Sequence, residues 1–392
     1  MLATYRRALR YSIFLFVLSF TSAGVIGQEE SSVSVEIGDA PVAEINYQLE
    51  EMAGELNHPS SIAFLPNGDF LIAERNAGLT IVHEGGNTDV NKMPDIHVRQ
   101  QAGLLDVVLH PEFPENQVIY FSYSHGDSGA NGTRLSRAKL VISEDHSEAS
   151  LQDLEVLFTQ APLTDTSQHY GGRILFLEDS TLLLTLGEGS RYMDRAVELD
   201  NHLGKVVRLN DDGSIPSDNP FVDHPDAQPE IFTYGHRNPQ GLLVTSNGKI
   251  LAHEHGPRGG DEINLLEAGL NYGWPAITYG INYSGEIISP FSQREGLQQS
   301  IIHYVPSIAP SGFTLYEGEL FPEWRGDLFI GGLVSTHVRR IDLDENGNFG
   351  DQEKLFTELG ARIRDIRTGP NGALYFVTDA SDGKLYRVTP KN

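Results

Sequence analysis

One histidine stands in a setting suited to proton transfer. His169 lies in the heptad SQHYGGR, residues 167–173, directly before an apolar run typical of a strand. Imidazole is the side chain best suited to accept a proton near neutral pH. Gly171 and Gly172 would let the backbone approach a ligand closely. The heptad alone leaves two interpretations open: a general base, or a hydrogen-bonded loop residue among the 14 histidines of the chain.

Arginines occur at two further places where they could act together on an anion. Arg237 and Asn238 precede Pro239, which favours an extended backbone at Asn238. Arg362 and Arg364 are two residues apart, so in a strand both side chains point to the same face. Guanidinium groups pair with carboxylates in a fork and polarise carbonyls. The alternatives are a surface arginine and a solvated pair.

A loop rich in glycine and acid follows the first of these arginines. Residues 255–262, HGPRGGDE, offer the backbone carbonyls of Gly256 and Pro257 and the carboxylate of Glu262. Calcium takes six to eight oxygen ligands, carbonyls among them. The spacing is not that of an EF-hand, so the loop alone is a weak metal motif.

Composition excludes several classes of protein. A net charge of -26 argues against nucleic acid or anionic membrane as partners. Without cysteine the chain has no disulfide, thiolate metal site or c-type haem of its own. GxSxG, HExxH, Walker and well-placed GxGxxG motifs are missing from the sequence. The chemistry therefore points to redox power from a bound organic cofactor.

The elements that must position these residues are strands. A unit of apolar run, turn and apolar run recurs about every fifty to seventy residues. Its copies begin at Ser61, Asp106, Gly172, Leu242, Trp324 and Asp365. This repeat predicts an all-β, six-bladed β-propeller with four-stranded antiparallel blades; a pair of β-sandwiches is the alternative. The long gaps 188–204 and 272–300 should gather on the active-site face, and a strand near 45–49 should complete the last blade.

The N-terminus reads as a targeting segment. Arg6, Arg7 and Arg10 precede an apolar run over 11–20 that is too short to span a bilayer. We therefore expect a signal peptide at 1–27, a flexible leader at 28–45 and a propeller domain at 46–392. The mature protein would be periplasmic or secreted, without stable membrane insertion. An uncleaved anchor is the alternative.

Several stretches in a fixed order resemble the glucose/sorbosone dehydrogenase family of soluble quinoproteins. They include QAGLLDVVLHPEF from Gln101, QHYGGRI from Gln168, YGHRNPQGL from Tyr234, EHGPRGGDEINLL from Glu254 and RIRDIRTGPNGALY from Arg362. The resemblance as a whole runs from about residue 55 to residue 388. The resemblance implies a six-bladed propeller that binds pyrroloquinoline quinone (PQQ) and Ca²⁺ and oxidises the C1 hydroxyl of aldoses to lactones.

The resemblance also implies roles for individual residues. His169 would be the general base and Arg237 the group that polarises the hydride-accepting carbonyl. The remaining predicted contacts divide into quinone contacts and metal ligands: Gln101, Asn238, Arg362 and Arg364 for the quinone, the carbonyls of Gly256 and Pro257 for its calcium, and Glu262 and Tyr272 for a second, structural calcium. Electrons would pass to a soluble carrier or a quinone.

Two positions depart from the family pattern. Gln168 stands where glucose dehydrogenases of the family carry Asp before the base, so His169 would be a weaker base or be oriented by another group. Val334 stands where a Lys commonly contacts the quinone. A non-catalytic propeller that binds a sugar or a protein would explain both departures and stays open as an alternative. A calcium-dependent lactonase-type hydrolase is the other alternative.

Overall fold

Strands dominate the computed structural model, which describes residues 34–344 and 348–391. Its helices are short: α1 (Phe113–Asn116) and 3₁₀ turns at Met193–Val197, Pro322–Trp324 and Thr357–Leu359. None of the helices in the described ranges is long and apolar enough to cross a membrane. The predicted signal peptide, 1–27, lies outside these residues and stays a prediction.

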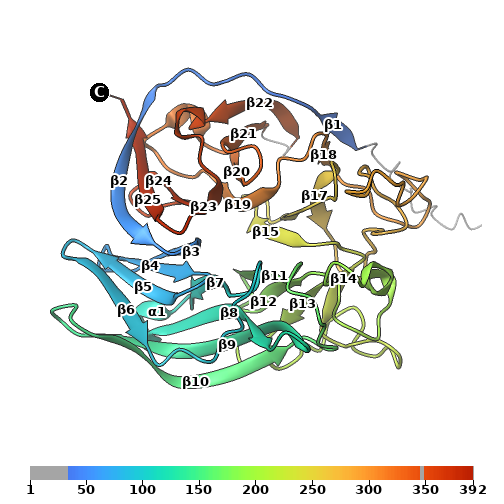
Figure 1. The fold of residues 1–392 in the computed structure, drawn as a ribbon, viewed down its shortest axis with the longest axis horizontal. Coiled ribbons are helices and arrows are strands. Elements are labelled where there is room, and N and C mark those ends of the chain that lie inside the picture. The colour runs from blue at the N-terminus through green and yellow to red at the C-terminus, as the bar shows by residue number, and fades with distance from the viewer. Residues whose placement is uncertain (1–33, 345–347, 392) are drawn as a thin grey trace, which may run out of the picture. The chain divides into compact units, whose positions relative to one another are not determined.

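Consecutive strands pair antiparallel and form small sheets (Figure 1). One sheet contains β11 (Gly171–Phe176), β12 (Leu182–Leu186), β13 (Lys205–Leu209) and β14 (Ile231–Tyr234). Another contains β19 (Pro310–Leu315), β20 (Leu328–Gly332), β21 (Val338–Leu343) and β22 (Phe349–Leu355). The predicted all-β class and four-stranded antiparallel units are confirmed.

Two sheets gain a strand from the N-terminal part of the chain. β15 (Pro239–Val244), β16 (Ile250–Glu254), β17 (Asp261–Leu266) and β18 (Ile302–Tyr304) are joined by β1 (Val35–Ile37), which runs parallel to β18. β23 (Ile363–Thr368), β24 (Leu374–Thr378) and β25 (Gly383–Pro390) are joined by β2 (Tyr47–Leu56). β2 pairs antiparallel with β25, as expected for an N-terminal strand that completes the last sheet (Figure 1).

The described part of the predicted leader, residues 34–45, contacts the edges of two sheets. Besides β1, Val42 bridges Lys354 at the edge of β22. The side chain of Ser34 bonds to Ser300 and His303. Acidic, small-residue sequence predicted flexibility, but edge strands with free backbone groups can order a segment that has no core of its own.

The remaining sheet has eight strands and consists of two successive meanders. The first is β3 (Pro59–Phe64), β4 (Phe70–Glu74), β5 (Gly78–His83) and β6 (Gly86–Asn91). The second is β7 (Leu104–Leu109), β8 (Val118–Gly126), β9 (Asn131–Ile142) and β10 (Ala149–Thr159). Their outer strands, β6 and β10, pair in parallel over a short stretch.

The first strands of successive meanders lie beside one another. β3 neighbours β7, β7 neighbours β11, and the series continues through β15, β19 and β23 back to β3. Apolar clusters fill the space between adjacent sheets; one joins Ile62 and Ile72 to Val377 and Leu385. Burial on both faces explains why β12 is apolar almost throughout instead of alternating.

Candidate active site

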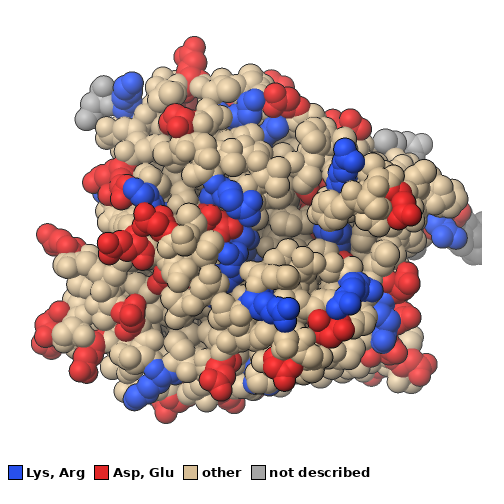
Figure 2. Space-filling model, viewed as in Figure 1, with Lys and Arg blue, Asp and Glu red and all other residues tan. Residues whose placement is uncertain are grey.

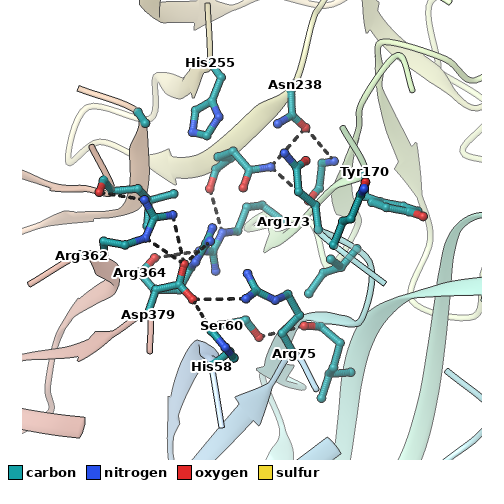
Figure 3. A pocket seen from close by; sticks show the side chains of 18 of the residues that line it. His58, Ser60, Arg75, Tyr170, Arg173, Asn238, His255, Arg362, Arg364 and Asp379 are labelled. Atoms are coloured by element: carbon teal, nitrogen blue, oxygen red, sulfur yellow. Dashed lines mark hydrogen bonds and ion pairs between the residues drawn. The ribbon is translucent and has the colours of Figure 1, made fainter. Parts of the chain in front are cut away.

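A cavity of about 480 Å³ opens where the first strands of the meanders begin and the second strands end (Figure 3). Antiparallel pairing brings these ends to one edge, so residues far apart in sequence meet there. Of the predicted quinone contacts, Gln101, Asn238, Arg362 and Arg364 all line this cavity. Its volume falls within the range of about 300–1,000 Å³ that is usual for small-molecule sites.

His169 lies at the edge of this site, directly before β11. Its side chain is buried, and its Nδ1 lies 2.7 Å from Oε1 of Glu188. Its backbone N–H donates to Oε1 of Gln101 at 2.9 Å. Gly187 permits this packing, because a Cβ there would lie 2.0 Å from the carbonyl oxygen of His169. The imidazole is therefore held in one orientation by a carboxylate that follows β12.

The surroundings of His169 favour its neutral form. Burial lowers the pKa of its imidazole, and the positive charge of Arg237 lowers it further. The hydrogen bond and negative charge of Glu188 act in the opposite direction and raise it. A neutral imidazole with a carboxylate on Nδ1 can accept a proton at Nε2 and then be stabilised as imidazolium.

Arg237 points away from the large cavity and towards the loop after β16. Its Nη1 donates to the carbonyl oxygens of His255 at 3.1 Å and Gly256 at 2.9 Å. Its guanidinium lies 5.4 Å from the centre of the Trp274 ring. The predicted calcium ligands Gly256 and Pro257 are absent from the lining of the 480 Å³ cavity. The carbonyl of Gly256 is thus engaged by an arginine of the same site.

Arg362 and Arg364 lie on one face of the chain at β23, as their spacing predicted, and converge on a carboxylate of the protein. Oδ2 of Asp379 accepts from Nη2 of Arg362 at 3.2 Å and from Nη2 of Arg364 at 2.9 Å. Oδ1 of Asp379 lies 3.4 Å from Nη2 of Arg75 and 2.9 Å from Nδ1 of His58. Figure 3 shows Asp379 between Arg75 and the other two arginines.

This arrangement determines the charge of Asp379. Burial alone would raise the pKa of its carboxyl, but Arg364 and Arg75 hold that pKa well below its usual range. Arg173 also lines the cavity, and it has carboxylate partners of its own in Asp106 and Asp365. The cavity lining therefore contains four arginines and one carboxylate. On the face viewed in Figure 2, basic side chains gather near the centre and acidic ones towards the rim.

A second, small pocket lies beyond Arg237 and contains the other predicted metal ligands. Glu262 and Tyr272 line it together with Glu254 and Gly256. Burial and the neighbouring Glu254 raise the pKa of Glu262 to about 8. Its Oε2 accepts from Asn264 at 3.4 Å. The hydroxyl of Tyr272 donates to the carbonyl of Leu265 at 2.6 Å and is turned to the protein backbone.

The two positions that depart from the family pattern have distinct surroundings. Val334 lines the large cavity and is 64% exposed. Gln168 lies in a neighbouring surface hollow of about 260 Å³ with Arg99 and Asp165. The group that orients His169 is Glu188, so the expectation of another orienting group is met by a residue 19 positions along the chain.

Sequence reasoning missed Glu188, Arg75 and Asp379. Glu188 follows the apolar run Leu182–Leu186, and Arg75 and Asp379 each follow the second strand of a meander. The signal that could have found them is positional: polar residues directly after the second strand lie at the same edge as those directly before the first.

A model of the family described as glucose/sorbosone dehydrogenase matches residues 56–387. The chain belongs to this family. Aldose sugar dehydrogenase YliI of Escherichia coli K12 is 41% identical over 353 residues, which cover 88% of this chain and 93% of the relative. The resemblance inferred from the sequence, and the expectation of an enzyme homologous to quinoprotein sugar dehydrogenases, are confirmed.

Solved structures of family members share the fold. The apo form of the soluble aldose sugar dehydrogenase of Escherichia coli superimposes with a TM-score of 0.84 at 39% identity, covering 88% of this chain and all of that chain. The PQQ-bound aldose sugar dehydrogenase of Streptomyces coelicolor gives a TM-score of 0.69 at 24% identity, covering 89% and 100%. The second likeness concerns the fold alone.

Proposed function

We propose that this family member oxidises the C1 hydroxyl of aldose sugars to the lactone, with hydride transfer to bound PQQ. One observation carries the proposal: a buried histidine with a carboxylate on Nδ1 lies beside a cavity lined by arginines. The first arrangement suits proton abstraction and the second suits a polyanionic cofactor. The E. coli relative named an aldose sugar dehydrogenase supports the substrate class.

We further propose that the sheets are the blades of a six-bladed propeller. The eight-stranded sheet would then be two blades joined at their outer strands by the β6–β10 pair. The cyclic order of neighbours from β3 to β23 supports this division. Closure would bring His169 before β11 and Arg362 before β23 to the same cavity, with residues 46–392 as the catalytic domain.

The lining fits a planar ligand that carries several carboxylates. Arg362 and Arg364 would hold carboxylates of PQQ, while Asn238 and Gln101 would contact its polar edge. Asn238 is oriented for this, because its Oδ1 accepts from the backbone N–H of Gly171 at 3.1 Å. The chemistry supplied by the bound quinone would be the acceptance of a hydride, a capacity that no side chain of this protein has.

The protein's own part in the reaction is proton transfer and charge stabilisation. With its Nδ1–H donated to Glu188, His169 would take the proton of the C1 hydroxyl on Nε2. The buried carboxylate of Glu188 would stabilise the imidazolium that results. Arg237 would stabilise negative charge at the reacting end once its guanidinium turns from the carbonyls of His255 and Gly256 towards the cavity. Burial lowers the pKa of His169, and the positive charge of Arg237 lowers it further.

The two predicted calcium sites fit the structure unequally. In this arrangement the carbonyl of Gly256 already accepts from Arg237, so we assign no cation and no step to Gly256 and Pro257. Glu254 is buried and Glu262 is half-buried, and the amide of Asn264 donates to both. A cation between them would relieve the repulsion of the two carboxylates, so we assign the proposed Ca²⁺ to this pocket.

The proposal includes export and an external electron acceptor. A cleaved signal peptide at 1–27 would deliver the protein to the periplasm or outside the cell. Electrons would pass to a soluble carrier or a quinone, because the chain has no cysteine for a covalent haem.

Dye reduction by purified apo-protein tests this function. Addition of PQQ and Ca²⁺ should allow reduction of a redox dye with at least one sugar from a panel of aldoses. His169→Gln should lower turnover by about 10²–10⁴-fold, the usual contribution of a general base, with quinone binding retained. His224→Gln, an exposed loop histidine, is the control. No quinone binding and no reduction with any sugar would refute the proposal, and full turnover by His169→Gln would remove His169 from its role.

A further inference from the structure

Arg75 is a cation of the cavity that the proposed function leaves without a role. It directly follows β4, on a different sheet from Arg362 and Arg364. Its side chain is 16% exposed and lines the cavity. Nε is buried and has no hydrogen-bond partner among the described residues. A buried guanidinium N–H without an acceptor is costly, so it marks a place where an acceptor is expected.

The backbone holds Arg75 firmly in this position. Its N–H donates to the carbonyl of His58 at 3.0 Å, and its carbonyl accepts from the N–H of Leu104 at 3.1 Å. Gly103 packs against it so closely that a Cβ there would lie 2.0 Å from the carbonyl oxygen of Arg75. The side chain therefore starts from a fixed point between β3 and β7 and reaches Asp379, which follows β24 on the neighbouring sheet.

The charges around Arg75 are incomplete. Among the described residues, Asp379 is the carboxylate within 4 Å of Arg75, and it is shared with Arg362, Arg364 and His58. One negative charge thus serves three guanidinium groups. The positive charge that Asp379 does not balance lies between two sheets and faces the cavity (Figure 3).

We propose that Arg75 binds a carboxylate of the anionic ligand directly, opposite the arginines of β23, and that Asp379 is the protein's own carboxylate holding the three arginines together in the absence of ligand. The inference rests on the proposed function for the identity of the natural ligand. The kind of ligand does not depend on that function: the cavity binds a planar ligand with at least two carboxylates, which arginines from two different sheets contact.

Equilibrium binding of PQQ to apo-protein tests this role without any turnover. Arg75→Gln should weaken binding about 10- to 100-fold, the range expected for losing hydrogen bonds to a charged group. The salt dependence of binding should also become shallower, because one cation fewer contacts the ligand. Arg387→Gln, which disrupts an exposed pair with Glu50 on the outer strands, is the matched control.

Benzene-1,3,5-tricarboxylate separates this inference from the redox function, because it has the carboxylates but no quinone. Wild-type protein should bind it, and Arg75→Gln should bind it at least tenfold more weakly. Binding of tricarboxylate that depends on Arg75, without any binding of PQQ, would sink the dehydrogenase and leave the arginine clamp standing. Equal PQQ affinity in wild type and Arg75→Gln would overturn the clamp and leave the dehydrogenase standing.

Arg75→Lys guards against a variant that fails to fold. It keeps the positive charge beside Asp379 but removes the planar fork, so it should melt close to wild type and still lose severalfold in PQQ affinity. A purely structural role predicts the reverse pattern, in which both variants melt earlier and bind PQQ as tightly as wild type. That result would refute the assignment.

Discussion

The large cavity and the small pocket behind it bury carboxylates in opposite electrostatic settings. In the cavity, Asp379 is surrounded by Arg75, Arg362 and Arg364, and its pKa is depressed. In the small pocket, Glu262 faces Glu254 with an amide as its donor, and its pKa is raised to about 8. Burial raises the pKa of both carboxyls, but the neighbouring charges act in opposite directions. The arginines reverse the effect of burial at Asp379, whereas Glu254 adds to it at Glu262, so one region suits an anion and the other a cation.

Replacing Asp379 in the large cavity should have the largest effect on stability. Asp379→Asn leaves the half-buried Arg75 and Arg364 without their carboxylate, and removing one partner of a buried ion pair typically costs about 3–5 kcal/mol. Urea unfolding of apo-protein at pH 7 measures the loss. PQQ should restore much of it, because the ligand's carboxylates replace the missing one.

The pH dependence of this difference has a definite sign. A carboxyl whose folded pKa is depressed contributes stability above its unfolded pKa of about 3.9 and loses it as the pH falls further. The gap between wild type and Asp379→Asn should therefore shrink below about pH 4. Asp382→Asn, an exposed neighbour, should show no gap. A constant gap from pH 7 to pH 3 would contradict the ion-pair explanation.

Replacing Glu262 in the small pocket should have a smaller effect on stability, which appears only when metal is present. Calcium at 100 times its Kd should stabilise wild type by about 2.7 kcal/mol. Glu262→Gln should abolish this gain, because the carboxylate that faces Glu254 is gone. Chelation of the metal should then leave the melting temperature of the variant unchanged. Glu267→Gln, exposed beyond the end of the same strand, should retain the calcium effect; a calcium effect in Glu262→Gln equal to wild type would move the ion elsewhere.

Glu188 sharpens the comparison, because only one of its two carboxylate oxygens is bonded. Oε1 bonds to His169, and Oε2 is buried without a hydrogen-bond partner among the described residues. Since Glu188 raises the pKa of His169, Glu188→Gln should lower that pKa and shift the acid limb of kcat/KM to lower pH. Turnover should fall about 10-fold, because the imidazolium loses its carboxylate. The control Glu198→Gln changes an exposed carboxylate on the same connection. An unshifted acid limb would show that another group titrates.

Sequence could predict the elements that repeat and the residues that fall in motifs. The apolar runs and turns predicted the strands from β3 to β5 and from β23 to β25, because both sheet faces are buried and the turns carry Asn-Gly. His169, Arg362 and Arg364 were found because each lies in a motif directly before or within the first strand of a unit.

Residues without a local signature could not be predicted. Asp379 looks like a turn residue until the fold brings it to Arg75, which is more than 300 positions earlier in the chain. Glu188 reads as part of a glycine loop until β11 and β12 pair and place it against His169. The β6–β10 pair joins outer strands whose sequences give no sign of it. Residues and strands that meet only in the folded chain leave no local pattern in the sequence.

The pairing of β2 with β25 has a consequence for the timing of folding. Tyr47 pairs with Pro390 in this ladder, so β2 cannot pair until β25, the last of the described strands, has been made. Contacts between such distant positions are slow to form, and until they form the edge of β2 stays open to other chains. Polypeptide emerging from the ribosome or a translocation channel could not complete this sheet until nearly all of it had been released. The unpaired edge of β2 must therefore be kept from pairing with other chains until β25 has been made.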